Sequence, residues 1–254
     1  MTCVTSKVFR LAEALLLPAA LSSQALSPAT ASPCIDVALV LAVDSSASVS
    51  AGEYALQQWG IAAAFRDKDV RDALVRAGRV AVAVMFWGSE NMPKPQSGWV
   101  LVEDGQGAER FARIVESMPR QVTGDTGLGA GLMASLAKFD GLNMCSLRRV
   151  VNVSGDGAET RATRGSRRAA EPQAARDLAE AMQVEINALA ISNQEPELAD
   201  YYAANVVTGP DAFVMEAADY GAFAEALRHK LIREISLRML SGLPAVPLSA
   251  NPVR

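Results

Sequence analysis

Histidine and cysteine are scarce in this sequence. Its 254 residues include one histidine, His229, and three cysteines, Cys3, Cys34 and Cys145. Zinc fingers and histidine-rich metal centres need more of both residue types, so the composition excludes them. Any metal site must therefore use oxygen ligands, and we interpret His229 as a solvated helix residue.

Positive charge is also in short supply. The 24 Lys and Arg residues are outnumbered by 28 Asp and Glu residues, for a formal net charge of −4. This balance gives no electrostatic basis for sequence-independent binding to nucleic acid. The chain contains neither a GxxxxGK(S/T) phosphate loop nor a GxSxG nucleophile elbow, so no motif indicates a P-loop ATPase or a hydrolase of that type.

Long hydrophobic runs are missing beyond the amino terminus, where no stretch approaches the ~20 apolar residues of a membrane span. Residues 1–31 resemble an export signal, with basic Lys7 and Arg10, a short apolar run, and candidate cleavage sites after Ala25 and after Ala31. An amphipathic leader that stays attached is the alternative. Cleavage predicts a soluble periplasmic or secreted protein that retains two of the three cysteines.

Aliphatic strands alternate with amphipathic helices along the rest of the chain. Apolar runs of the kind found in buried parallel sheets predict strands over 36–43, 79–86, 98–102, 149–153, 184–191 and 212–215. Helical spacing predicts helices over 50–65, 108–118, 127–139, 172–182, 198–204 and 220–240. The alternation predicts an α/β fold, a three-layer α/β/α sandwich around a doubly wound, mostly parallel six-stranded sheet of the Rossmann-like kind.

One domain accounts for most of the sequence. It spans 34–240, and the Pro-rich residues 241–254 are predicted to form a loose tail. In the first predicted helix, Ala55, Trp59, Ala62 and Phe65 recur at helical spacing and are expected to share a face. We interpret the three tryptophans as core or edge packing.

Polar residues follow two of the predicted strands, at the positions where doubly wound sheets bind ligands. Asp44, Ser46 and Ser48 come directly after the first strand, and Asp156 lies in a turn after the fourth. Thr126 stands at the head of a helix between them. These carboxylates and hydroxyls are hard oxygen donors that suit Mg²⁺ better than zinc or copper. Each also has a structural interpretation, as a helix cap for Ser46 or Ser48 and an Asx-turn for Asp156.

The order and spacing of these five residues resemble the metal-ion-dependent adhesion site (MIDAS) of von Willebrand factor type A (vWA) domains. The resemblance covers nearly all of the predicted domain at the level of element order. Finer features resemble the exported bacterial family known as domain of unknown function 1194, namely VSGDG at 153–157, INALAI at 186–191, YY at 201–202 and GPDAFV at 209–214. Ala47 departs from the MIDAS pattern, which often has glycine there.

The resemblance implies a role for each residue. Ser46, Ser48 and Thr126 would contact a divalent cation directly or through water, while Asp44 and Asp156 would hold its water shell. The implied cation is Mg²⁺, or else Mn²⁺ or Ca²⁺, and its open position would accept an acidic side chain of a partner protein. The sequence is therefore predicted to encode a non-enzymatic, exported, cation-dependent protein-binding module of the adhesion type.

Two other functions stay open at this stage. A metal-assisted phosphohydrolase using the same oxygen cluster would need a general base or a cationic phosphate clamp, and neither is identified. A structural vWA domain with a vestigial site is the other. Arg161, Arg164, Arg167 and Arg168 follow the Asp156 turn, and we interpret them as part of a solvated loop.

Two cysteines provide a test of the topology. Cys34 lies ten residues before Asp44, and Cys145 lies eleven residues before Asp156. If both carboxylates end neighbouring parallel strands, both cysteines lie near the opposite ends of the same strands. In an oxidising compartment we expect a disulfide between them, worth roughly 4 to 5 kcal/mol of stability in the chain-entropy description.

Overall fold

The computed structural model of the protein describes residues 34–121, 124–160 and 171–236. The predicted export signal, the predicted tail and the four arginines between 161 and 168 lie outside the described residues. Within the described ranges, no helix has both the length and the apolar character that crossing a membrane requires.

A six-stranded sheet forms the centre of the described domain. Its spatial order is β3-β2-β1-β4-β5-β6, and its strands are β1 (Ile35–Asp44), β2 (Val80–Trp87), β3 (Val100–Val102), β4 (Ser146–Gly155), β5 (Glu185–Ile191) and β6 (Val214–Ala217). Only the pairing of β2 with β3 is antiparallel among these strands. The predicted mostly parallel, doubly wound sheet is confirmed.

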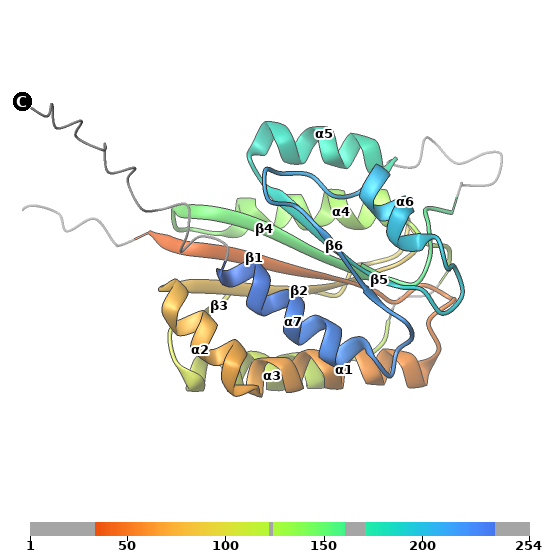
Figure 1. Ribbon diagram of the computed structural model, residues 1–254. Helices are drawn as coiled ribbons and strands as arrows, with labels where there is room; N and C mark the ends of the chain where they lie inside the picture. Colours follow the sequence, from red (N-terminus) through yellow and green to blue (C-terminus); the bar gives the residue numbers. More distant parts are fainter. Residues whose placement is uncertain (1–33, 122–123, 161–170, 237–254) are drawn as a thin grey trace, which may run out of the picture. The chain divides into compact units, whose positions relative to one another are not determined.

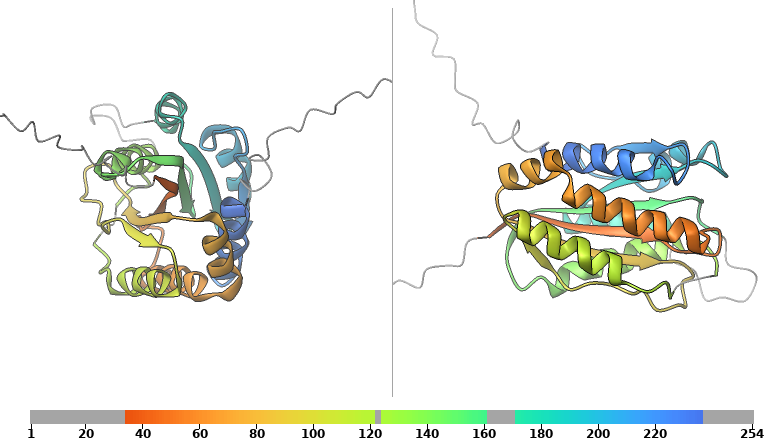
Figure 2. Two further views of the ribbon diagram at one scale, coloured as in Figure 1. Left: turned by 90° about the vertical axis from the view of Figure 1, so that its left-hand side faces the viewer. Right: turned by 90° about the horizontal axis from the view of Figure 1, so that it is seen from below.

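Helices cover both faces of this sheet (Figures 1 and 2). One layer contains α1 (Ala51–Arg66), α2 (Lys68–Ala77), α3 (Gly105–Ser117) and α7 (Phe223–Ser236). The other contains α4 (Leu128–Ala137), the short 3-10 helix η1 (Lys138–Gly141), α5 (Pro172–Met182) and α6 (Leu198–Asn205). The molecule is therefore the three-layer α/β/α sandwich that the sequence predicts.

The central strand β1 shows why its sequence is a continuous apolar run. Val37, Leu39 and Leu41 pack into the core beneath α1, α2, α3 and α7, while Val40 and Ala42 pack into the core beneath α4, α5 and α6. Successive side chains of a strand point to opposite faces, and here both faces are covered. Each position must therefore be apolar, which removes the alternation of a half-exposed strand.

The predicted buried face of α1 is partly wrong. Phe65 and Ala62 are buried as expected, but Ala55 is exposed and the Trp59 side chain is 61% exposed. The helix turns Tyr54, Gln57 and Ile61 toward the core in their place. Trp59 is therefore a surface residue, in contrast to the core or edge position predicted for it.

The sequence prediction also missed α2, although its signals are present. Asp67 ends α1 and caps α2, because its carboxylate accepts hydrogen bonds from the backbone N–H groups of Asp69 and Val70 at 2.9 and 3.1 Å. Val70, Ala73 and Leu74 then form its buried face at helical spacing. The direct succession of two helices without a loop concealed the boundary.

A disulfide joins Cys34 and Cys145, as the spacing predicts. The bond connects the amino ends of the neighbouring strands β1 and β4, and the backbone N–H of Ile35 donates to the carbonyl of Cys145 at 2.8 Å. It closes a loop with a sequence separation of 111 residues. A covalent link over so long a loop restricts the unfolded chain strongly.

Replacing both cysteines, in Cys34→Ser/Cys145→Ser, should lower the free energy of unfolding by about 2–5 kcal/mol, because the unfolded chain regains loop entropy. Urea unfolding followed by tryptophan fluorescence measures the change. Wild type with its disulfide chemically reduced is the control and should unfold like the double variant. Two free thiols among Cys34 and Cys145 in the native exported protein, detected by mass spectrometry, would contradict the prediction.

Candidate metal centre

The two predicted carboxylates lie at the carboxyl end of the sheet. Asp44 is the last residue of β1, and Asp156 directly follows Gly155, the last residue of β4. Since β1 and β4 are adjacent and parallel, their carboxyl ends lie side by side. Both side chains are buried, with Asp44 fully inaccessible to solvent.

A chain of hydrogen bonds connects four of the predicted ligands. The carboxylate Oδ1 of Asp44 accepts the backbone N–H of Ser46 at 2.7 Å. The hydroxyls of Ser46 and Ser48 lie 3.1 Å apart, and the Ser48 hydroxyl donates to Oδ1 of Asp156 at 2.7 Å. Because Ser48 gives its proton to Asp156, Ser46 must be the donor in the serine pair. The Ser46 oxygen therefore keeps its lone pairs for another ligand.

Neither serine caps the next helix. The cap of α1 is Ser50, whose hydroxyl accepts the backbone N–H of Glu53 at 3.2 Å while the Glu53 carboxylate accepts the N–H of Ser50 at 2.8 Å. The alternative interpretation of Ser46 and Ser48 as capping residues is therefore wrong. Their hydroxyls instead face each other and the second carboxylate.

Thr126 lies in the segment before α4, and among the described residues no hydrogen bond joins its side chain to the other four. Its carbonyl accepts the N–H of Thr160 at 2.9 Å, and its own N–H donates to the Thr160 hydroxyl at 3.3 Å. Gly157 lies against it, since a Cβ placed on Gly157 would be 3.7 Å from the Thr126 hydroxyl oxygen. The threonine hydroxyl thus faces the turn that carries Asp156.

Two carboxylate oxygens in this cluster lack well-formed hydrogen bonds within the described ranges. Oδ2 of Asp44 and Oδ2 of Asp156 are both buried and accept no well-formed hydrogen bond among the described residues. The backbone N–H of Asp156 lies near the Asp44 carboxylate, and the Tyr220 hydroxyl lies near the Asp156 carboxylate. A buried, unsatisfied carboxylate oxygen is costly, so it requires a compensating group. A cation with its water shell would compensate both at once, and the surrounding hydroxyls are suitable ligands for it.

The electrostatics of Asp44 lead to the same conclusion. Burial raises its pKa to about 7, the N–H of Ser46 opposes that rise, and the negative charge of Asp156 adds to it. A nearby divalent cation would reverse the balance by favouring the charged form. The centre therefore contains two carboxylates that are largely shielded from water.

Glu159 and two tyrosines surround the five residues. Glu159 accepts the backbone N–H of Gly129 at 2.7 Å, near the start of α4, and burial raises its pKa to about 7. Tyr202 and Tyr220 are buried, and burial followed by the charges of the two aspartates raises the pKa of both phenols. Sequence reasoning assigned these tyrosines no role, because neither lies near Asp44 or Asp156 in the chain.

The ligand types available limit the kind of metal site that can form here. Within the described ranges, no group of three or more His, Cys, Asp or Glu side chains could hold a metal ion, so a cation here must rely on hydroxyl oxygens. Arg120 contacts the site loop but donates to the backbone carbonyls of Ser46 and Val49, so it holds the loop in place. His229 is exposed on α7, as predicted.

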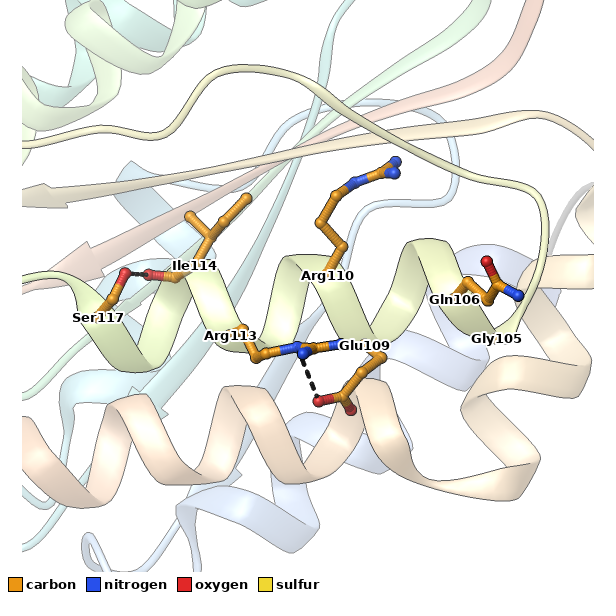
Figure 3. A pocket seen from close by; sticks show the side chains of 7 residues that line it. All are labelled: Gly105, Gln106, Glu109, Arg110, Arg113, Ile114 and Ser117. Carbon is orange, nitrogen blue, oxygen red and sulfur yellow. Dashed lines mark hydrogen bonds and ion pairs between the residues drawn. The ribbon is translucent and has the colours of Figure 1, made fainter.

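A separate surface hollow lies along α3 (Figure 3). It has a volume of about 690 Å³ and is lined by Gly105, Gln106, Glu109, Arg110, Arg113, Ile114 and Ser117. Its acidic residue, Glu109, already pairs with Arg113 at 3.3 Å and with Arg66 at 2.8 Å. None of the candidate metal ligands lines this hollow, which is therefore distinct from the centre.

Comparison with known families supports one assignment. The model of a family described as "Protein of unknown function (DUF1194)" matches residues 33–239. No curated protein sequence matches the chain.

Solved structures with the same fold are distant in sequence. The pilus adhesin SpaC from Lactobacillus rhamnosus GG is 14% identical, with a TM-score of 0.57 over 81% of this chain and 32% of that one. The vWF domain of the type V pili tip protein Mfa5 from Porphyromonas gingivalis is 10% identical, with a TM-score of 0.51 over 81% of this chain and 97% of that domain.

A third similar structure is proximal thread matrix protein 1 from the mussel byssus, described with a zinc-occupied MIDAS motif. It is 16% identical, with a TM-score of 0.52 over 79% of this chain and 46% of that one. This chain therefore spans about a third of SpaC and about half of the byssus protein. At such identities the likeness establishes the von Willebrand factor type A fold.

Without metal, wild type should lose stability relative to Asp44→Asn as the pH rises. The pKa of Asp44 in the folded protein, about 7, exceeds its ordinary value of 3.8, so protonation favours the fold. This contribution is complete below pH 3.8 and is lost as the pH rises through 7, by an amount on the order of 4 kcal/mol. Urea unfolding in EDTA from about pH 4 to about pH 8 measures it. A pH-independent difference would show that Asp44 is not perturbed.

Proposed function

The chain belongs to the family described as "Protein of unknown function (DUF1194)", and from this premise we propose that it is a divalent-cation-dependent, protein-binding module of the adhesion type. One observation carries the proposal. Among the described residues, the buried oxygens Oδ2 of Asp44 and Oδ2 of Asp156 accept no well-formed hydrogen bond, and they lie in a cluster with the hydroxyls of Ser46 and Ser48. A small hard cation is the group that best suits these carboxylate and hydroxyl oxygens.

Each residue has a defined role in this proposal. The hydroxyls of Ser46, Ser48 and Thr126 hold the cation, and the carboxylates of Asp44 and Asp156 bind its water shell. Mg²⁺ is the expected ion, with Mn²⁺ or Ca²⁺ as alternatives. When bound, the cation supplies a Lewis-acidic position for a carboxylate, so the partner is a protein that presents an acidic side chain.

The similar structures support an adhesive role. Two of them are described as a pilus adhesin and a pili tip protein, and the byssus protein carries zinc in its MIDAS motif. The predicted export signal and the Cys34–Cys145 disulfide agree with a periplasmic or secreted location. A binding role needs no catalytic base, which is consistent with the lack of a histidine in the cluster.

Removing a carboxylate should weaken cation binding. Calorimetric titration of Mn²⁺ into wild type should give saturable heat, while Asp44→Asn and Asp156→Asn should bind at least about tenfold more weakly, because losing a metal site's supporting carboxylate typically costs 10–100-fold. Asp72→Asn is the control, since Asp72 is an exposed residue of α2 that pairs with Lys68 at 2.6 Å.

Two results would reject the proposal in different ways. Wild type that binds no Mn²⁺ would leave a structural domain with a vestigial site. Hydrolysis of p-nitrophenyl phosphate that Asp44→Asn abolishes would establish the phosphohydrolase instead.

The affinity for Mn²⁺ should increase with pH. The cation requires the charged form of Asp44, whose pKa is about 7, so protons compete with the metal below that value. The apparent affinity should rise up to about tenfold per pH unit below pH 7 and level off above it. Titrations at a series of pH values measure this dependence. Affinity that is constant from about pH 5 to about pH 8 would contradict it.

A further inference from the structure

The turn that carries Asp156 is held by side chains from a different part of the chain. The Tyr202 hydroxyl donates to the carbonyl of Gly157 at 3.1 Å. The next two backbone N–H groups are also engaged, because Ala158 donates to Oε2 of Glu195 at 3.1 Å and Glu159 donates to the Tyr201 hydroxyl at 3.3 Å. We call Glu195, Tyr201 and Tyr202 the tyrosine clamp.

The clamp comes from one short stretch of the fold. Tyr201 and Tyr202 lie on α6, and Glu195 precedes this helix in the loop after β5. The strand β5 is the neighbour of β4 in the sheet, which places α6 beside the turn (Figure 1). Three side chains thus bind backbone groups of three consecutive residues of the turn.

Tyr202 is in close contact with the candidate metal centre. It is fully buried, and a Cβ placed on Gly155 would lie 2.6 Å from its hydroxyl oxygen and 3.1 Å from Oδ2 of Asp44. No side chain fits between them, so glycine is required at this position. The hydroxyl donates to the Gly157 carbonyl, while within the described ranges Oδ2 of Asp44 and Oδ2 of Asp156 accept no well-formed hydrogen bond.

Glu195 also lies close to a candidate ligand. A Cβ placed on Gly157 would lie 3.5 Å from Oε1 of Glu195 and 3.7 Å from the Thr126 hydroxyl oxygen. Gly157 therefore lies between the clamp and a candidate ligand. Any shift of the turn would move Asp156 relative to Thr126 and to Ser48, to which Asp156 is hydrogen bonded at 2.7 Å.

We propose that Glu195, Tyr201 and Tyr202 are positioning residues of the metal centre, which fix the turn at 156–159 so that Asp156 and Thr126 face one cation. This inference rests on the proposed cation binding. It also gives a role to the YY pair at 201–202, which the five-residue motif leaves unexplained. The clamp acts through the backbone, so it raises cation affinity without contributing a ligand.

The decisive variant is Tyr202→Phe, which removes one hydroxyl and keeps the aromatic ring in the core. Its matched control is Tyr54→Phe, because Tyr54 is also buried and also donates to a backbone carbonyl, that of Met118, at 3.2 Å. For each protein, calorimetry gives the Kd for Mn²⁺, and urea unfolding in EDTA gives the metal-free stability. Electron paramagnetic resonance of the bound Mn²⁺ reports on its ligand geometry.

If the clamp positions the turn, the two variants should differ in their affinity for Mn²⁺. Tyr202→Phe should weaken Mn²⁺ binding by about 10–100-fold, as supporting residues of metal sites do, and should alter the Mn²⁺ spectrum at saturation. Tyr54→Phe should keep the wild-type Kd and spectrum while losing a comparable amount of metal-free stability. If Tyr202→Phe loses stability but keeps the wild-type Kd and spectrum, the clamp is only structural and the inference is overturned.

Glu195 provides a second test that separates geometry from charge. Glu195→Gln keeps an oxygen that accepts the N–H of Ala158, whereas Glu195→Ala removes it. A positioning role predicts that the glutamine variant keeps near wild-type affinity and the alanine variant loses it. Equal losses in both would assign the effect to charge and overturn the positioning role of Glu195.

The failure of this inference differs from the failure of the proposed function. Wild type that binds Mn²⁺ with an affinity unchanged by Tyr202→Phe keeps the function and rejects the clamp. Wild type that binds no Mn²⁺ rejects both.

Discussion

The parallel pairing of β1 with β4 is the constraint on which the site depends. Val43 pairs with Ser154 in this register, so Asp44 and Asp156 lie at the same, carboxyl end of the sheet. The Cys34–Cys145 disulfide joins the same two strands at their amino ends. The pair of strands is thus linked covalently at one end and through Ser46 and Ser48 at the other.

Burial of two neighbouring carboxylates is the main energetic cost of this arrangement. Desolvation raises the pKa of Asp44 to about 7, and the charge of Asp156 adds to the rise. Among the described residues, one backbone N–H reaches Oδ1 of Asp44 and one hydroxyl reaches Oδ1 of Asp156, and neither Oδ2 atom accepts a well-formed hydrogen bond. A proton or a cation must compensate the remaining charge. Competition between the two links the stability of the metal-free fold to the proposed metal binding.

Sequence patterns predicted the elements of the fold better than their orientation. The aliphatic runs of β1, β2, β4 and β5 identified buried strands because both faces of the sheet are covered. Helical spacing was ambiguous in α1, where Trp59 is exposed and Gln57 is buried. The face that a helix buries depends on the helices beside it, which a local pattern does not contain. The boundary between α1 and α2 was missed because Asp67 is both the C-cap of α1 and the N-cap of α2.

The sequence by itself determined which residue types are available, since the types and order of Asp44, Ser46, Ser48, Thr126 and Asp156 predict a cluster of hard oxygen donors. It also determined the disulfide, because nearly equal spacing along parallel strands brings both cysteines to one end. Only the tertiary structure decided which oxygens are left unpaired, and which side chains hold the Asp156 turn. Those contacts join residues such as Gly157 and Tyr202 that are far apart in the chain, and no periodicity or spacing in this sequence indicates them.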